Sequence, residues 1–352
     1  VGLGAETFGY TLKSNECFSS PEAVMLYTDN GIGDMSRKMH SFIRDTIAPQ
    51  EICKYRPVVL NTWETCYYNL NEDILISLAR RAKECGMDML VLDDGWFGKR
   101  NDDTSSLGDW ILDTRKFPSG LKLLSERIHE CGMNFGIWIE PEMINYDSEL
   151  YKIHPDWCLV CKERKPTMAR HQLLLDFCNP DVLDYLKETF SNTFKNVKID
   201  YFKWDFNRNA SEYGSGFLSP EQQDEALFRY QKGLYELLFW FKEQFPDVFI
   251  ESCSGGGGRY DLGMMAFSTQ IWASDNTTAT DRLRIQYGST LAYPASVMSC
   301  HVSDPRESAD VANALDYKYK VAIGGILGYE FNIAECSEEF TNEIAGQIKL
   351  YR

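Results

Sequence analysis

Residues 203–208 place ionisable side chains directly after a run that is expected to form a buried strand. Residues 197–202 alternate and are rich in β-forming residues, which favours a strand. Burying the ammonium group of Lys203 or the carboxylate of Asp205 is unfavourable unless the group is paired or used in chemistry. At the C-terminal end of a barrel strand, such groups are typical of an active site. The alternative is a charged strand end that faces solvent.

Polar side chains, tryptophans and glycines also end most of the other strand-like runs. These residues are Asn61 and Glu64, Asp93 and Asp94, Trp138 and Glu140, Cys253 and Gly255, Trp272 and Asp275, and His301. In a barrel, these strand ends all meet at one mouth. Aromatic faces beside carboxylates form a typical sugar-binding surface, and glycoside hydrolysis requires two carboxylates that flank a sugar. Glycoside hydrolysis is therefore the chemistry that these residue types indicate.

Four consecutive glycines at 255–258 follow the fifth strand-like run. A phosphate-binding P-loop would need a Lys-Ser or Lys-Thr pair after them, and a dinucleotide site would need Gly-x-Gly-x-x-Gly after a strand; the sequence has neither. We interpret the glycines as letting the backbone approach a ligand closely. Some of the polar residues have structural explanations. Glu140 and Glu142 flank Pro141 and could fix a loop, and His301 is more simply a hydrogen-bonded strand-end residue.

Eight strand-like runs alternate with helical patterns along most of the chain. The expected strands are 56–63, 87–96, 134–142, 197–205, 247–255, 269–275, 295–303 and 325–331. The expected helices are 72–85, 121–131, 181–195, 221–245 and 280–293. This alternation predicts an α/β fold, a (β/α)8 TIM barrel, in which residues 173–177 belong to an excursion after the third strand.

The beginning of the chain does not follow this repeat. Short strands are expected at 7–12 and 23–28, and a helix is expected at 36–47. We interpret residues 1–50 as the remnant of a preceding β domain, namely the tail of an N-terminal β domain plus a linker helix. Residues 51–352 are then the catalytic barrel.

The 352-residue chain carries a formal net charge of -16 and is 44% hydrophobic. The hydrophobic content is enough for a large core, and the acidity argues against nucleic acid and anionic membrane surfaces as partners. No apolar stretch is long enough to span a bilayer. The 11 cysteines are an odd number scattered through apolar segments, which is typical of reduced thiols and predicts a cytoplasmic protein.

One pair of cysteines has the spacing of metal ligands. Cys158 and Cys161 are separated by two residues, with His154 nearby. A zinc site needs a second pair of ligands, which the surrounding sequence does not offer. We therefore predict no metal and no other cofactor.

Several motifs, in this order, resemble those of the α-galactosidases of glycoside hydrolase family 36. They are Asp-Asp-Gly-Trp-Phe-Gly at 93–98, Trp-Ile-Glu-Pro-Glu at 138–142, Lys-Trp-Asp-Phe-Asn at 203–207, Cys-Ser-Gly-Gly-Gly-Gly-Arg at 253–259 and Trp-Ala-Ser-Asp-Asn at 272–276. The likeness covers nearly the whole chain. It implies a retaining α-galactosidase that removes terminal α-linked galactose from oligosaccharides of the melibiose and raffinose type.

The resemblance implies that Asp205 is the catalytic nucleophile and that Asp275 is the general acid and base. It also implies sugar-binding roles for Asp93, Asp94, Trp138, Arg170, Lys203, Cys253 and Gly255. A retaining mechanism forms and then hydrolyses a covalent glycosyl-enzyme. Asp275 must then hold a proton at the working pH, so its pKa should be raised, whereas Asp205 must stay ionised.

Other functions remain open on the same scaffold. An α-N-acetylgalactosaminidase would differ around residues 253–257, where the resemblance places the O2 group of the sugar. A galactosyl transglycosylase would pass the sugar to another sugar instead of water. A non-catalytic carbohydrate-binding protein is disfavoured because both catalytic carboxylates are present. Members of the family usually carry further β domains, so a homo-oligomer is expected if such domains are present.

Overall fold

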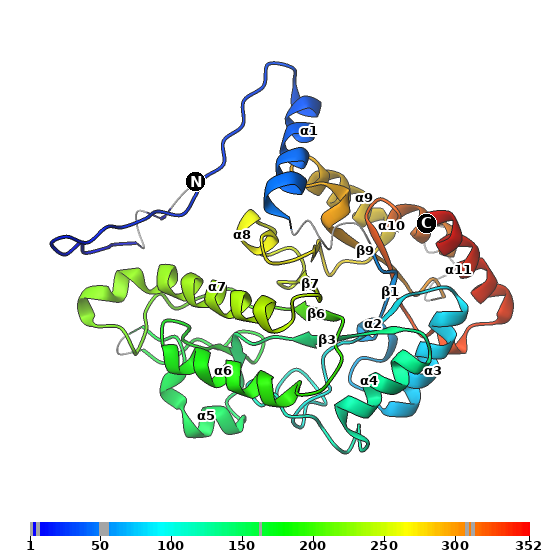
Figure 1. Ribbon diagram of the computed structural model, residues 1–352, viewed down its shortest axis with the longest axis horizontal. Coiled ribbons are helices and arrows are strands. Elements are labelled where there is room, and N and C mark those ends of the chain that lie inside the picture. The colour runs from blue at the N-terminus through cyan, green and yellow to red at the C-terminus, as the bar shows by residue number, and fades with distance from the viewer. Residues whose placement is uncertain (1–2, 5–7, 49–55, 162–163, 307–309, 311–313) are drawn as a thin grey trace.

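The computed structural model describes residues 3–4, 8–48, 56–161, 164–306, 310 and 314–352. Eight parallel strands in this part of the chain close into a barrel, with helices around it (Figure 1). Around the barrel the strands follow the order β1-β10-β9-β8-β7-β6-β3-β2. Each barrel strand therefore lies beside the next barrel strand in the chain. The predicted (β/α)8 TIM barrel is confirmed.

Each barrel strand lies within a run that was predicted from the sequence. The strands are β1 (Val59–Asn61), β2 (Met89–Leu92), β3 (Asn134–Ile139), β6 (Tyr201–Trp204), β7 (Phe249–Ser252), β8 (Gln270–Trp272), β9 (Met298–Ser303) and β10 (Ile326–Glu330). Two further strands, β4 (Met143–Ile144) and β5 (Leu173–Leu174), pair antiparallel outside the barrel. This pairing confirms that residues 173–177 belong to an excursion.

Helices follow the barrel strands and cover the outside of the barrel. The α-helices are α1 (Ile32–Phe42), α2 (Trp63–Cys66), α3 (Glu72–Glu84), α4 (Gly120–Glu130), α5 (Glu149–Ile153), α6 (Pro180–Thr193), α7 (Ala226–Gln244), α8 (Leu262–Met265), α9 (Ala279–Thr290), α10 (Leu315–Ala322) and α11 (Glu338–Tyr351). A π-helix, η1 (Ile43–Ile47), continues α1, and short 3-10 helices are η2 (Pro155–Trp157), η3 (Pro220–Glu225), η4 (Ala295–Val297) and η6 (Ile333–Glu335). Among the described residues, every helix is too short or too polar to span a lipid bilayer.

Side chains along each strand alternate between the barrel interior and the layer of helices. On β6, Tyr201 joins a small apolar cluster inside the barrel. Phe202 and Trp204 point outward and pack on Phe241 of α7, with ring centroids 5.3 and 5.2 Å apart. The position between them, Lys203, therefore faces the interior. An apolar, aromatic strand thus delivers a charged side chain to the inside of the barrel.

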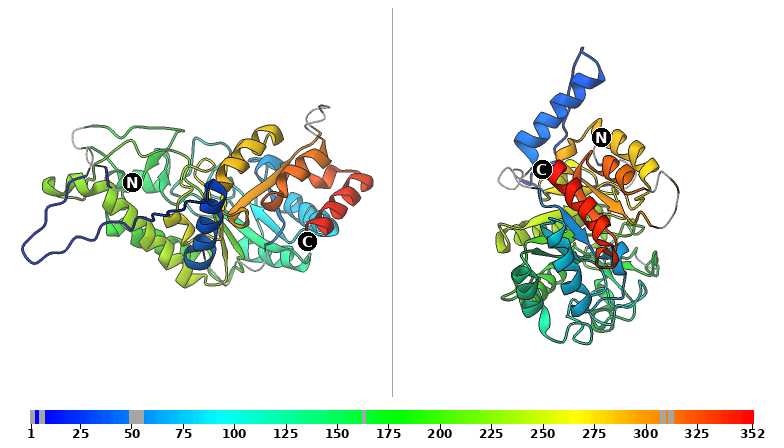
Figure 2. Two further views of the ribbon diagram at one scale, coloured as in Figure 1. Left: turned by 90° about the horizontal axis from the view of Figure 1, so that it is seen from above. Right: turned by 90° about the vertical axis from the view of Figure 1, so that its right-hand side faces the viewer.

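The N-terminal segment differs from the prediction. No strand forms at the described residues 8–12 and 23–28, which run as extended chain beside and away from the barrel (Figure 2). A strand needs a neighbouring strand, and neither segment has one in the described part of the chain; the N–H of Gly9 donates instead to the carbonyl oxygen of Asp224 in η3 at 3.2 Å. The predicted helix at 36–47 is present as α1 and η1. The assignment of residues 1–50 to a preceding β domain stays a prediction, and residues 49–55, which contain the predicted boundary, lie outside the described residues.

Helix α7 lies so close to the β5 excursion that one of its residues has no room for a side chain. A Cβ atom on Gly233 would stand 2.2 Å from the carbonyl oxygen of Phe177, whereas one on Gly346 in α11 would meet nothing within 4 Å. We expect Gly233→Ala to destabilise the fold by about 1–3 kcal/mol because the backbone must move. The control Gly346→Ala should stabilise it by about 0.5–1 kcal/mol, since alanine favours a helix interior. Urea denaturation measures both changes, and equal effects would contradict this packing.

Candidate active site

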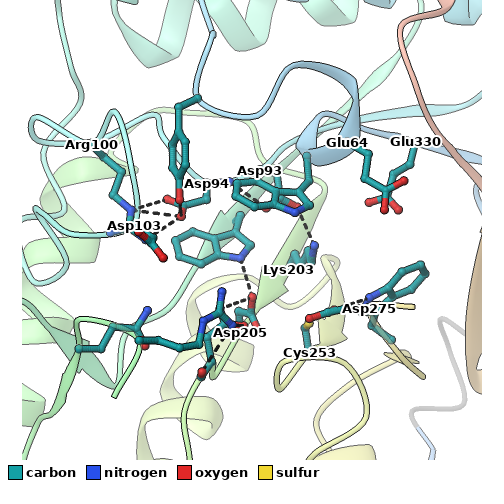
Figure 3. Close-up of a pocket in the computed structure, with 17 residues that line it drawn as sticks. Glu64, Asp93, Asp94, Arg100, Asp103, Lys203, Asp205, Cys253, Asp275 and Glu330 are labelled. Atoms are coloured by element: carbon teal, nitrogen blue, oxygen red, sulfur yellow. Dashed lines mark hydrogen bonds and ion pairs between the residues drawn. The ribbon is translucent and has the colours of Figure 1, made fainter. Parts of the chain in front are cut away.

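A pocket opens among the C-terminal ends of the barrel strands (Figure 3). Its volume is about 630 Å³, including the solvent at its mouth. The lining residues are Trp63, Glu64, Tyr68, Asp93, Asp94, Arg100, Asp103, Trp138, Arg170, Gln172, Lys203, Asp205, Asn207, Cys253, Trp272, Asp275 and Glu330. Eight of the nine predicted site residues are among them. The ninth, Gly255, lies in an adjoining groove that also contacts Asp275.

Asp205 follows β6 at an inward position and is buried. Its carboxylate accepts hydrogen bonds from Trp138 Nε1 at 3.1 Å and from Asn207 Nδ2 at 2.7 Å. Burial by itself would raise the pKa of Asp205. The positive charge of Lys203 and the hydrogen bonds to the carboxylate outweigh burial, so the pKa lies below its usual value. Asp205 is therefore ionised at neutral pH.

Asp275 follows β8, and its side chain is exposed at the pocket mouth. Trp272 Nε1 donates a hydrogen bond to Oδ1 at 2.9 Å. The surrounding protein atoms still limit hydration of the carboxyl group, and this effect and the negative charge of Asp205 raise the pKa of Asp275. The charge of Lys203 and the hydrogen bond from Trp272 oppose the rise without cancelling it. The pKa values of the two carboxyl groups are thus shifted in opposite directions.

The glycine run after β7 packs against the segment that carries Asp275. A Cβ atom on Gly256 would lie 2.8 Å from the Cα atom of Ser274, and one on Gly257 would lie 2.6 Å from the carbonyl oxygen of Ala273. Glycine at these two positions is therefore required by the chain's own packing, and the close approach of this backbone to a ligand stays a prediction. Gly255 is different, because its backbone N–H is directed at the carboxylate of Asp205, with an N–O distance of 3.4 Å.

Lys203 and Asp93 form a buried ion pair, with 2.7 Å between Nζ and Oδ2. Asn61 Nδ2 donates to the same carboxylate oxygen at 2.8 Å, and the backbone N–H of Asp94 donates to the other at 2.8 Å. Burial lowers the pKa of Lys203, but the charge of Asp93 outweighs it and holds this pKa well above its ordinary value. Lys203 therefore stays a cation inside the barrel.

Asp94 is held by Arg100, a buried residue from the loop after β2. Arg100 donates from Nε to Oδ1 at 2.8 Å and from Nη2 to Oδ2 at 2.7 Å, and Tyr68 donates its hydroxyl proton to Oδ2 at 3.3 Å. A bidentate arginine fixes the plane of a carboxylate. Arg100 carries no periodic signal in the sequence, because it lies in a polar loop whose course the sequence does not specify.

Asn207 connects Arg170 to Asp205. Its Oδ1 accepts a hydrogen bond from Arg170 Nη1 at 2.9 Å, while its Nδ2 donates to Asp205. Arg170 is exposed and lies in a turn, where its φ is 49°. Arg208 holds this turn, because its Nη1 donates to the carbonyl oxygens of Thr167 at 2.6 Å and Gln172 at 2.8 Å. Both Asn207 and Arg208 closely follow Asp205 in the sequence, which is the signal by which they could have been found.

The structural interpretation of Glu142 and Glu140 is confirmed. Glu142 is fully buried and accepts hydrogen bonds from Trp204 Nε1 at 3.2 Å and Arg259 Nη1 at 2.8 Å. Glu140 is also fully buried and accepts a hydrogen bond from the backbone N–H of Asn207. Burial and the nearby charge of Asp205 raise the pKa of Glu140 well above its usual value. Neither glutamate lines the pocket.

Nine lining residues were not among the predicted site residues. They are Trp63, Glu64, Tyr68, Arg100, Asp103, Gln172, Asn207, Trp272 and Glu330. Glu64 and Trp272 carry the strand-end signal described above. Tyr68 and Arg100 come from loops, which places them beyond the reach of a periodic pattern.

The cysteines that the structure describes are all free thiols. Cys161 Sγ accepts a hydrogen bond from the backbone N–H of Tyr213 at 3.4 Å, and His154 stacks on Trp157 with ring centroids 3.8 Å apart. Within the described ranges, no three side chains of His, Cys, Asp or Glu are grouped so that they could hold a metal ion. The cytoplasmic location stays a prediction.

The sequence matches known proteins over its whole length. A family model described as Melibiase matches residues 17–352. Alpha-galactosidase AgaA of Geobacillus stearothermophilus is 44% identical over 356 residues, which cover 100% of this chain and 49% of that enzyme. The chain belongs to the melibiase family. Another member, alpha-galactosidase Mel36A of Lactobacillus acidophilus, is 43% identical over 354 residues, covering 100% of this chain and 48% of that enzyme.

The melibiase fold is shared in three dimensions. The crystal structure of the GH36 alpha-galactosidase AgaA matches with a TM-score of 0.96 at 43% identity, covering 99% of this chain and 49% of that chain. The resemblance to family 36 is therefore confirmed. Variants of AgaA have been solved in complex with raffinose and with stachyose. The chain spans about half the length of the curated relatives it matches.

Asn207→Ala removes a hydrogen bond from the carboxylate of Asp205. We expect the pKa of Asp205 to rise, so that the acid limb of the pH profile of kcat/KM moves to higher pH. We also expect kcat/KM at its optimum to fall roughly 10- to 100-fold, since a hydrogen bond to a charged group contributes about 1.5–3 kcal/mol. The pH profile with an aryl α-galactoside measures both effects. Asn192→Ala, on the exposed surface of α6, is the control, and an acid limb that stays in place would rule out this role of Asn207.

Proposed function

We propose that the protein is a retaining α-galactosidase that hydrolyses terminal α-linked galactose from oligosaccharides. The observation that carries the proposal is the pair Asp205 and Asp275, which line one pocket and whose pKa values are shifted in opposite directions. A double displacement requires one ionised and one protonated carboxyl group at the same sugar. Named alpha-galactosidases at 43–44% identity support the same reaction class.

In the first step, Asp205 attacks the anomeric carbon and the glycosidic C–O bond breaks. Asp275 gives its proton to the leaving oxygen, which departs with the electron pair of the broken bond as an alcohol. The sugar is then held as an ester on Asp205. In the second step, Asp275 takes a proton from water, and the water oxygen attacks the anomeric carbon and expels the carboxylate of Asp205. Two inversions give net retention at the anomeric carbon.

The pocket floor suits the hydroxyl groups of galactose. Asp93 and Asp94 offer carboxylate oxygens whose positions are fixed by Lys203 and Arg100. Galactose differs from glucose in the direction of its O4 hydroxyl. A sugar whose O4 hydroxyl points away from these carboxylates forgoes a hydrogen bond to a charged acceptor, which contributes about 1.5–3 kcal/mol. We infer that Asp93 and Asp94 select galactose over glucose.

The remaining predicted residues surround this floor. Trp138 presents an indole that is hydrogen-bonded to Asp205, so its face is held beside the nucleophile. Arg170 stands at the pocket mouth, where its guanidinium group can donate to sugar hydroxyls. Cys253 and the N–H of Gly255 lie on the β7 side of Asp205, where the resemblance places the O2 group of the sugar. These four residues are the proposed walls of the galactose site.

The proposed nucleophile can be tested directly. Asp205→Ala should lower kcat by roughly 10⁴-fold or more, since the covalent step is lost. A 2-deoxy-2-fluorogalactosyl fluoride should label the wild-type protein on the peptide that contains Asp205, as detected by mass spectrometry. Asp184→Ala, which removes an exposed carboxylate on α6, is the matched control and should retain activity. Labelling of a different residue would refute the assignment.

The proposed substrate class has its own test. We expect p-nitrophenyl α-galactoside to be hydrolysed much faster than the corresponding α-N-acetylgalactosaminide, because the β7 loop packs closely beside Asp205. Raffinose and stachyose, which are bound by variants of AgaA, are the oligosaccharides to try first. Product analysis at high acceptor concentration separates hydrolysis from transfer to another sugar, and size-exclusion chromatography tests the predicted homo-oligomer. If p-nitrophenyl α-galactoside is not hydrolysed, the proposed activity is wrong.

A further inference from the structure

Glu330 is a buried pocket residue that the proposed mechanism does not use. It is the last residue of β10, is only 3% exposed, and still lines the pocket. In Figure 3 it enters the pocket from the side away from Asp94 and Arg100. Its carboxyl group therefore reaches the space in which a sugar would lie, while the rest of the residue is enclosed by protein.

Glu330 differs from the other buried glutamates in its hydrogen bonds. Each of the others accepts at least one hydrogen bond from the protein. They are Glu140, Glu142, Glu212, Glu225 and Glu251. Within the described ranges, the carboxyl group of Glu330 neither accepts nor donates a hydrogen bond. The basic atom found within 4 Å of it there is Nδ1 of His301, which lies 3.3 Å from Oε2. Because buried carboxyl groups in proteins are hydrogen-bonded, this carboxyl group is available to a ligand group that enters the pocket.

His301 does not supply that partner as a cation. Burial lowers the pKa of His301 to about 4 and raises the pKa of Glu330 to about 8. Both groups are therefore neutral at pH 7, and their contact is not an ion pair. Nδ1 of His301 itself has no hydrogen-bond partner, so the prediction that His301 is hydrogen-bonded is wrong for this atom. The His301 ring packs directly on Gly328, where a Cβ atom would lie 2.3 Å from its Cδ2 atom.

The charged groups around Glu330 form contacts with other residues, although Nε of Arg282 has no hydrogen-bond partner among the described residues. These groups are Glu64 of α2, Asp93 after β2, Lys203 of β6, Glu251 of β7 and Arg282 of α9. Lys203 is paired with Asp93, and Glu251 accepts a hydrogen bond from Gln270 at 3.0 Å. Arg282 donates to the carbonyl oxygen of Ser299 at 2.9 Å. Among the described residues, neither Lys203 nor Arg282 lies within 4 Å of the carboxyl group of Glu330 as an ion pair, and the contact found there is the one with His301.

We propose that Glu330 is a further sugar-binding residue, whose carboxyl group forms a hydrogen bond with one hydroxyl group of the galactose in this pocket. The inference rests on the proposed function. A neutral carboxyl group and a sugar hydroxyl can each donate and accept, so the two are complementary. An anionic ligand group would be repelled by the carboxylates of Asp93 and Asp205, and an apolar group would leave the carboxyl group unpaired. Glu330 thereby selects for a hydroxyl group at one ring position.

The test is the binding of galactose and its four monodeoxy analogues, which lack the 2-, 3-, 4- or 6-hydroxyl group, measured by titration calorimetry. For one analogue we expect the wild-type Kd to be about tenfold weaker than for galactose, the usual effect of losing one buried hydrogen bond. Glu330→Leu keeps the volume but removes the polar group, and should abolish most of that tenfold difference. Glu330→Gln keeps a donor and an acceptor in the same shape, and should retain it.

A matched control is Glu251→Gln, since Glu251 is equally buried and close by but does not line the pocket. Discrimination among the four analogues should be unchanged in this variant. The inference is overturned if Glu330→Leu shows the same four penalties as the wild type, or if Glu330→Gln loses the same discrimination as Glu330→Leu. A protein that binds galactose but does not hydrolyse galactosides contradicts the proposed function alone. Failure to bind galactose contradicts both.

Discussion

The buried ion pair between Lys203 and Asp93 sets the electrostatics of the whole pocket. Two charges persist inside a protein when they neutralise each other and their remaining lone pairs are hydrogen-bonded, as Asn61 and the backbone of Asp94 ensure here. The pair keeps Lys203 charged, and this charge lowers the pKa of Asp205 against the effect of burial. The negative charge maintained on Asp205 in turn raises the pKa of Asp275. The opposite shifts of these two pKa values thus depend on a third carboxylate, that of Asp93, which takes no part in the proposed bond-breaking steps.

Two different sources of rigidity hold the site together. The floor is fixed by strand pairing, since Trp138 is in register with Lys203 and Lys203 with Glu251 on neighbouring strands. The mouth is fixed by side-chain hydrogen bonds instead, of which the link from Arg170 through Asn207 is an example. Groups on the floor therefore move only if the barrel distorts. Groups at the mouth can be repositioned by changing a single hydrogen bond.

The sequence predicts the residues of the pocket floor well. Side chains alternate between the two faces of each strand with a period of two, and the C-terminal ends of all barrel strands meet at one mouth. The loop residue Arg100 was missed for a physical reason: its position depends on how a loop folds back onto Asp94. The strands expected at 7–12 and 23–28 are absent from the described residues 8–12 and 23–28, because a β-forming pattern does not state whether a neighbouring strand exists. The sequence does not single out Glu330, because its distinguishing feature is that no described donor forms a hydrogen bond to it, and this depends on the three-dimensional arrangement of its neighbours.

The alternation along β6 limits how this region of the sequence can vary between species. Insertion or deletion of one residue between Tyr201 and Asp205 would exchange the two faces of the strand. The indole of Trp204 would then occupy the pocket floor, and the carboxylate of Asp205 would be buried without partners against α7. A single substitution nearby cannot restore the original faces of the strand, because every side chain after the insertion or deletion has changed sides. Lineages that keep this chemistry are therefore expected to change the length of loops such as 98–108 while the strand keeps its count of residues.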